Sequence, residues 1–100
     1  MSRVQLTSAA ESDLEEILVF IGRERASPEA GARVVEAILS KAHVYAHHPL
    51  LGTDLPELDS TTRAFVVYSY VVLYQPDADG IHIVRVIHSA QDLLGALGLA

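Results

Sequence analysis

Apolar residues at helical spacing predict a first helix near the start of the chain. Those on its apolar face are Leu14, Ile17, Leu18 and Ile21. Ser8 and Glu11 have the spacing of a capping box, in which each side chain binds a free backbone N–H group at the helix start. Ahead of them, Val4 and Leu6 alternate with polar residues, which predicts a short N-terminal strand.

A second helix is predicted to follow almost at once. Ser27 is a good N-cap, and Pro28 suits the first helical position because its missing N–H group is not needed there. Its apolar stripe comprises Val34, Val35, Ile38, Leu39, Ala42, Tyr45 and Ala46. Because the connection is so short, the two helices are expected to pack antiparallel. A loop is predicted to run from the end of this helix, marked by Pro49 and Gly52, through Leu58.

From Thr62 the apolar period changes to two, which predicts a meander of three strands. The first places Arg63, Phe65 and Val67 on one face and Ala64, Val66 and Tyr68 on the other. The run SYVVLYQ predicts a central strand, and Asp77 to Gly80 a turn. The third strand is predicted to place Ile81, Ile83, Arg85 and Ile87 on one face and His82, Val84, Val86 and His88 on the other.

Composition and charge narrow the setting. The 100 residues suit a single domain, 1–100, and half of them are apolar, so the chain is expected to fold. The absence of cysteine excludes a disulfide framework, and no segment is apolar enough for a signal peptide or a membrane span, which favours a cytoplasmic protein. A net charge of −6 argues against direct binding of nucleic acid by this chain alone.

Two clusters of polar residues offer little chemistry. His43 and His47 lie four apart on the second helix, a spacing that can place two imidazoles on one metal, but no third ligand is evident. We therefore predict no metal site and no cofactor. The carboxylates of the first helix are interpreted as a solvated face; they are Glu11, Asp13, Glu15 and Glu16.

The strongest candidate site is formed by Arg63, Arg85 and His88, with Tyr68 or Tyr70 beside them. Cleavage of a phosphodiester needs an acid, a base and cations, and these residues supply part of that set. Strand alternation, however, places Arg85 and His88 on opposite faces. An ion pair between Arg85 and a carboxylate or a partner is an equally good interpretation. The apolar strands and tail are either core or a groove for a partner's helix or strand.

The order of these segments resembles the ParE branch of the RelE/ParE superfamily, the toxins of type II toxin–antitoxin pairs. The resemblance runs from Val4 to Leu94 and rests on the strand, the helical hairpin, Arg63 and four sequence runs. The runs are HHPLLG, Pro56-Glu57-Leu58, YVVLYQPDADG and RVIHSAQDL. It implies an α+β fold in which the N-terminal strand and the helical hairpin pack on a small antiparallel sheet, followed by a short C-terminal helix.

The resemblance also implies a function. ParE-like toxins inhibit DNA gyrase by binding, stabilise plasmids, and form a hetero-oligomer with a cognate antitoxin that neutralises them. They need no catalytic residues of their own. RelE-like relatives instead cleave mRNA on the ribosome, and in that alternative Arg63, Arg85 and His88 would be catalytic. A chain with one lysine and a net charge of −6 is poorly suited to the ribosomal A site, so the ParE-like interpretation is favoured.

One departure from the family pattern concerns the C-terminal segment, where Gln91 stands in place of a frequent basic residue. It leaves open a third possibility, a weakly toxic homologue that mainly binds its antitoxin. The residues predicted to contact the target or the antitoxin are Arg63, Tyr68, Tyr70, Arg85, His88, Gln91, Leu93, Leu94 and Leu97.

Overall fold

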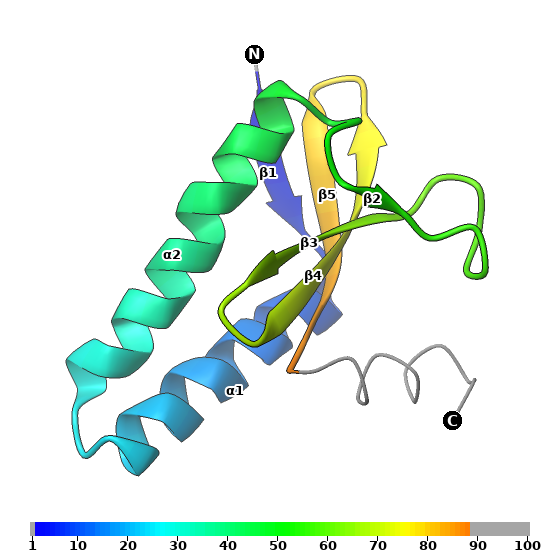
Figure 1. Cartoon of the computed structure of the whole chain (residues 1–100). Helices are drawn as coiled ribbons and strands as arrows, with labels where there is room; N and C mark the ends of the chain where they lie inside the picture. The colour runs from blue at the N-terminus through cyan, green and yellow to red at the C-terminus, as the bar shows by residue number, and fades with distance from the viewer. Residues whose placement is uncertain (1, 89–100) are drawn as a thin grey trace.

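The protein folds into a five-stranded sheet with a helical hairpin on one face (Figure 1). The structure is a computed structural model, and it describes residues 2–88. In chain order the elements are β1 (Arg3–Leu6), α1 (Ser8–Glu24), α2 (Pro28–His47), β2 (Thr53–Asp54), β3 (Arg63–Val67), β4 (Tyr70–Asp77) and β5 (Gly80–Ile87). The strand order is β1-β5-β4-β3-β2, which places β4 at the centre as predicted. The α+β class is confirmed. The sheet is mixed, because β1 joins β5 in parallel while the other pairs are antiparallel.

Helix α1 begins one residue earlier than its sequence signal predicts. The N-cap is Thr7, whose Oγ1 accepts a hydrogen bond from the Ala10 amide at 3.1 Å, so the predicted box of Ser8 and Glu11 is wrong. The same hydroxyl donates to the carbonyl of Val84 at 2.8 Å. Thr7 therefore both starts the helix and fastens it to β5, a tertiary contact that local spacing does not reveal.

The two helices touch closely at Gly31. A Cβ atom at this position would overlap the backbone carbonyl of Leu18, so only glycine allows the helices to approach this far. The backbone contact leaves the Leu18 side chain 41% exposed, and its predicted place on the buried face is wrong. On α2, Ile38, Ala42 and Ala46 are buried as predicted.

Aromatic rings connect the hairpin to the sheet. Tyr45 of α2 stacks on Phe65 of β3, with ring centroids 4.3 Å apart, and Tyr74 of β4 packs against both rings. Phe65 and Val67 share the face that the helices cover, whereas Ala64 belongs to a smaller cluster on the other face, as the alternation predicted. The main core thus lies between the hairpin and the sheet.

The chain reverses between β3 and β4 in a turn of two residues, Tyr68 and Ser69, without glycine or asparagine. Tyr68 takes the left-handed conformation, with φ of 53°. Strand β2 lies inside the predicted loop and pairs with the start of β3. Its two residues are too few to show a period in the sequence.

A β-bulge in β5 corrects the predicted faces of the last strand. Leu73 pairs with Arg85, but the next residue, Tyr74, pairs with Ile83, so Val84 is an extra residue in β5. Beyond the bulge the alternation is shifted by one position. Val86 therefore lies with Ile83 in the main core, although these two residues were predicted to face opposite sides. The predicted C-terminal helix lies outside the described residues.

Candidate functional site

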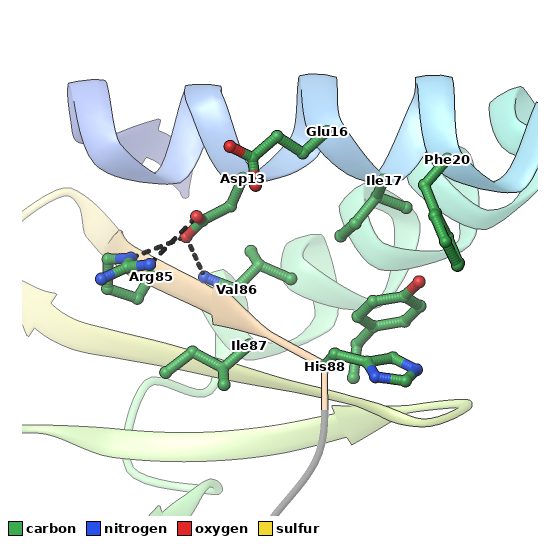
Figure 2. A pocket seen from close by; sticks show the side chains of 9 residues that line it. Asp13, Glu16, Ile17, Phe20, Arg85, Val86, Ile87 and His88 are labelled. Atoms are coloured by element: carbon green, nitrogen blue, oxygen red, sulfur yellow. Dashed lines mark hydrogen bonds and ion pairs between the residues drawn. The ribbon is translucent and has the colours of Figure 1, made fainter. Parts of the chain in front are cut away.

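A groove of about 520 Å³ lies between α1 and the C-terminal end of β5 (Figure 2). Its apolar walls are formed by Ile17, Phe20, Tyr70, Val86 and Ile87. Polar side chains stand at its ends, with Asp13, Glu16 and Arg85 at one and His88 at the other. Phe20 lies at the rim, and 52% of its surface is exposed. The groove is suited to an apolar segment with polar flanks.

Asp13 holds one end of the groove together. Its carboxylate accepts two hydrogen bonds from the guanidinium of Arg85, at 2.8 and 3.1 Å, and a third from the backbone N–H of Val86 at 2.8 Å. Strand β1 pairs with β5 only as far as Ile83, so beyond that point β5 is an open edge and Asp13 takes the place of a neighbouring strand. Only 11% of the Asp13 side chain is exposed.

This arrangement corrects one prediction and confirms another. Asp13 was assigned to a solvated acidic face, which is wrong because its carboxylate is turned onto β5. The ion pair predicted as one alternative for Arg85 is present. Hydrogen bonding to Asp13, and then its negative charge, raise the pKa of Arg85 above its ordinary value. In this structure the Arg85 guanidinium is bonded within the fold.

Tyr70 and His88 form the other end. Their ring centroids lie 5.2 Å apart, and burial raises the pKa of the Tyr70 hydroxyl. Arg85 and His88 thus line one groove, which simple alternation did not predict, but they stand at its two ends (Figure 2). With Arg85 bonded to Asp13, the pair does not form a compact acid–base site around one phosphate.

Comparison with known proteins identifies the family. Residues 4–93 match the family model described as "ParE toxin of type II toxin-antitoxin system, parDE". The chain belongs to the ParE toxin family. Among solved structures, a chain titled "Chromosomal ParDE TA system from P. aeruginosa" matches with a TM-score of 0.73 and 18% sequence identity, over 89% of this chain and 97% of that one. This likeness shows the fold. No curated protein matches in sequence.

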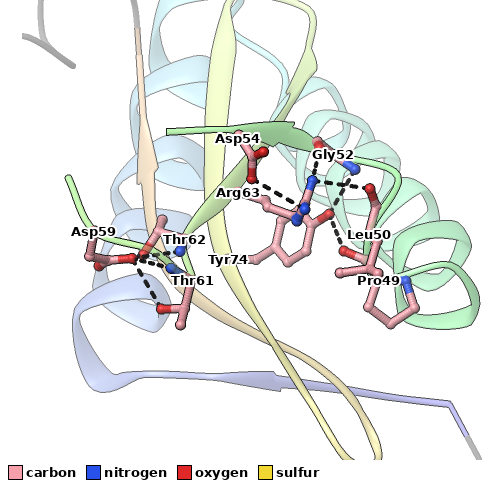
Figure 3. A network of polar contacts seen from close by, with 9 residues as sticks. All are labelled: Pro49, Leu50, Gly52, Asp54, Asp59, Thr61, Thr62, Arg63 and Tyr74. Carbon is pink, nitrogen blue, oxygen red and sulfur yellow. Dashed lines mark hydrogen bonds and ion pairs between the residues drawn. The ribbon is translucent and has the colours of Figure 1, made fainter. Parts of the chain in front are cut away.

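In this ParE-family chain, Arg63 does not line the groove, and the strand pairing places it away from the groove residues. It pairs with Tyr74, whereas the groove lies beside Tyr70 and Ile87 at the other end of β4. Its guanidinium donates to the carbonyls of Leu50 and Gly52 and forms an ion pair with Asp54 at 3.2 Å (Figure 3). Arg63 therefore fastens the loop that follows α2, and the predicted grouping with Arg85 and His88 is wrong.

The same loop is held by the hydroxyl of Tyr74. This group donates to the carbonyl of Pro49 at 2.7 Å and accepts from the amide of Gly52 at 2.9 Å (Figure 3). A Cβ at Gly52 would overlap that hydroxyl. Burial raises the pKa of Tyr74, so the group stays a neutral donor at ordinary pH. The predicted loop segment HHPLLG is therefore held to the sheet by the Tyr74 hydroxyl.

The remaining predicted contact residues are dispersed. Tyr68 projects from the β3–β4 turn and is 71% exposed, whereas Tyr70 is buried beneath the groove. Gln91, Leu93, Leu94 and Leu97 lie outside the described residues.

Neither helix of the described region is long and apolar enough to cross a bilayer.

The two histidines considered as metal ligands, His43 and His47, are both exposed on α2. His47 uses its Nδ1 in a hydrogen bond of 3.0 Å with the hydroxyl of Ser2. Within residues 2–88 no group of three His, Cys, Asp or Glu side chains could hold a metal ion.

Sequence reasoning assigned three of the nine groove residues to a site, Tyr70, Arg85 and His88, and Asp13 and Phe20 are two of the six that it missed. A signal for Asp13 was present, since it lies three residues after Ala10 and four before Ile17, and both are buried. An acid among the buried positions of a helix needs a partner inside the fold. Phe20 carries no such signal, because an exposed apolar residue looks the same in the sequence as a buried one.

Proposed function

We propose that this chain is the toxin of a type II pair that acts in the cytoplasm, inhibits DNA gyrase by binding, and is neutralised by a cognate antitoxin. Membership of the ParE family over residues 4–93 supports this proposal. The P. aeruginosa structure, titled as a ParDE system, supports an antitoxin partner for this chain as well.

The observation that carries the proposal is the state of the two arginines that a nuclease would use. Arg85 is held by Asp13, and Arg63 is held by the carbonyls of Leu50 and Gly52 and by Asp54. A ribonuclease needs cations directed at the phosphate where charge develops, and these two guanidiniums are bonded to groups of this chain at separate places. Binding a partner, in contrast, needs only the apolar groove and its rim.

We assign the groove to the antitoxin. Phe20 is half exposed at its rim, and burying an aromatic side chain contributes more to binding than most other contacts. An apolar segment of the antitoxin would cover Phe20, Ile17 and Val86 together. The resulting complex is a hetero-oligomer, and its formation would remove the groove from solvent.

A supercoiling assay tests both parts. Purified toxin is expected to inhibit gyrase, and an antitoxin encoded beside its gene is expected to restore supercoiling. Phe20→Glu should leave inhibition in place while weakening relief by the antitoxin at least about tenfold, because a charge would replace the ring that the antitoxin covers in the complex. Val44→Glu is the matched control, since Val44 is 50% exposed on α2 and outside the groove.

Unchanged gyrase activity at saturating toxin would overturn the assigned target. If translated mRNA were cleaved instead, and if cleavage were lost on changing His88 or Arg63 to alanine, the nuclease alternative would replace it. Harmless overexpression together with tight antitoxin binding would identify a homologue that has kept only its partner. Equal relief by the antitoxin of Phe20→Glu and Val44→Glu would show that the antitoxin binds elsewhere.

A further inference from the structure

A second hollow of about 490 Å³ lies on the other side of Tyr70 and His88, which line both hollows. It opens where the α1–α2 turn and the start of α2 meet the β3–β4 turn. Arg25 comes from the first turn, Arg33 from α2 and Tyr68 from the second turn. Its remaining walls include the apolar residues Ile21, Ala30 and Val34. None of the residues assigned to the groove's charged end takes part.

The charge of this hollow is opposite to that of the molecule. Arg25 and Arg33 line it and no Asp or Glu does, in a chain whose net charge is −6. Neither guanidinium forms a hydrogen bond or an ion pair with any residue of the described region, unlike those of Arg63 and Arg85. The acids nearest to Arg33 along α2 are Glu36 and Glu29. The Glu29 carboxylate accepts a hydrogen bond from the Ser27 hydroxyl and lies close enough to Arg33 for the two charges to interact. Two cations thus remain available to an anionic ligand.

Backbone strain is concentrated at the same place. Ala26 and Tyr68, with φ of 52° and 53°, are the non-glycine residues with positive φ in the described part of the chain. Ala26 follows Arg25 in one turn, and Tyr68 lines the hollow from the other. A left-handed conformation costs about 1 to 2 kcal/mol for a residue with a Cβ atom. Both residues belong to tight turns, one that ends α1 and one that joins β3 to β4, and strain of this kind is also found at binding sites.

We propose that this hollow binds an acidic segment of a protein partner. Carboxylates of the segment would pair with Arg25 and Arg33, whose planar guanidinium groups match a carboxylate with two parallel hydrogen bonds. An apolar side chain of the same segment would cover Ile21, Ala30 and Val34, and the exposed ring of Tyr68 would pack along it. The occupant is defined by its chemistry, and its assignment does not depend on gyrase being the target.

An acidic peptide fits the hollow better than a nucleic acid does. Nucleic acids draw most of their binding energy from a track of phosphate contacts, which needs many basic residues in a row. Here two arginines face an apolar floor, and the surrounding molecule carries an excess of negative charge that repels a polyanion. A segment with one or two carboxylates beside an apolar residue meets both features.

Nuclear magnetic resonance tests the assignment directly. The ¹⁵N-labelled chain is titrated with a short blocked peptide that alternates leucine with pairs of aspartate and glutamate. The expected result is a set of shifts centred on the amides of Tyr68 and Ser69 and on the side-chain Nε groups of Arg25 and Arg33. The same peptide with asparagine and glutamine in place of the acids should not produce these shifts, because the arginines would lose their ionic partners.

Charge variants make the test quantitative. Changing Arg25→Gln and Arg33→Gln together should weaken the acidic peptide about tenfold, the combined effect of two exposed ion pairs. Arg3→Gln with Arg23→Gln is the matched control, since it removes the same charge outside the hollow and should leave affinity unchanged. Arg25→Glu with Arg33→Glu should instead bind a lysine version of the peptide, a gain that a misfolded variant would not show.

Several results would overturn the proposal. Shifts that spread over the surface, or equal binding by the two double glutamine variants, would show that the hollow is not the site. Tighter binding of a single-stranded oligonucleotide at the same arginines would assign the hollow to nucleic acid. An acidic peptide that produces no shifts at all would exclude this class of occupant. None of these results bears on gyrase inhibition, so the two proposals fail separately.

Discussion

At the scale of single residues, some positions have a structural role that is unusual for their residue type. Ala26 stands in a helix C-terminal motif that usually contains glycine. The amides of Ser27 and Ala26 bond back to the carbonyls of Gly22 and Arg23, the two hydrogen bonds of a Schellman motif, and Ala26 holds φ of 52°. Helix α1 therefore ends at an alanine, although glycine would adopt this conformation with less backbone strain.

Replacing Ala26 with glycine is expected to stabilise the protein. Glycine adopts the left-handed conformation without steric strain, and part of that gain is offset by its greater freedom in the unfolded chain, so the free energy of unfolding should rise by about 0.5 to 1 kcal/mol. Urea denaturation measures the change. The control is Ala32→Gly on the exposed side of α2, which should lower stability by a similar amount. A loss of stability in Ala26→Gly would contradict the assignment of strain.

At the scale of elements, the loop between α2 and β3 is ordered by side chains that bind its backbone. Asp59 accepts hydrogen bonds from the amides of Thr61 and Thr62 and from both of their hydroxyls. These bonds lower the pKa of Asp59 from 3.8 to about 2, the Thr62 amide having the largest effect. With Arg63 and Tyr74 at the other end of the loop, the segment is fixed at two points.

The pH dependence of this loop follows from the sign of the shift. Because the folded state holds the Asp59 proton more weakly than the unfolded state, the carboxylate stabilises the fold fully above about pH 4. That contribution is lost as the pH falls from 3.8 to about 2. The stability difference between wild type and Asp59→Ala should therefore be constant above pH 5 and shrink below pH 4.

Urea denaturation at each pH measures this difference, and ¹³C NMR of the carboxyl carbon gives the pKa of Asp59 directly. Glu15→Ala, on the exposed side of α1, controls for the removal of one surface carboxylate. An Asp59 carboxyl that titrates near 3.8 would show that the four hydrogen bonds do not persist in solution.

At the scale of the whole molecule, Asp13 connects the first helix to the last strand, across 72 residues to Arg85 and 73 to Val86. The two contacts differ in burial. Arg85 is 47% exposed in its side chain, whereas the Val86 amide lies on a partly buried strand edge. The backbone contact should therefore matter more for stability than the ion pair, although the ion pair is the more visible of the two.

Asp13→Ala is expected to lower the free energy of unfolding by about 1 to 3 kcal/mol, because it leaves the Val86 amide without its acceptor. Arg85→Ala should lower it by only about 0.2 to 1 kcal/mol, the range for an exposed ion pair. Urea denaturation of both variants and of the double variant separates the two terms. Equal losses in the single variants would mean that the ion pair, and not the amide, is what Asp13 contributes.

The spacing of apolar residues in the sequence was enough to predict most of the secondary structure of this protein. The two helices, the central strand at 70–77, the turn before Gly80 and the faces of β3 all follow from local spacing, because a helix and a strand repeat every few residues. The family resemblance, confirmed over residues 4–93, added the order in which these elements pack.

Only the tertiary structure decided how the polar residues are used. The bulge at Val84 shifts the faces of β5, Asp13 caps the open edge beside it, and Arg63 turns to a loop in place of a site with Arg85. The sequence shows that these residues are charged and roughly where they lie along their elements. Their partners lie on segments that are distant in the chain and meet only when the fold packs. The local spacing of residues therefore cannot predict which groups they contact.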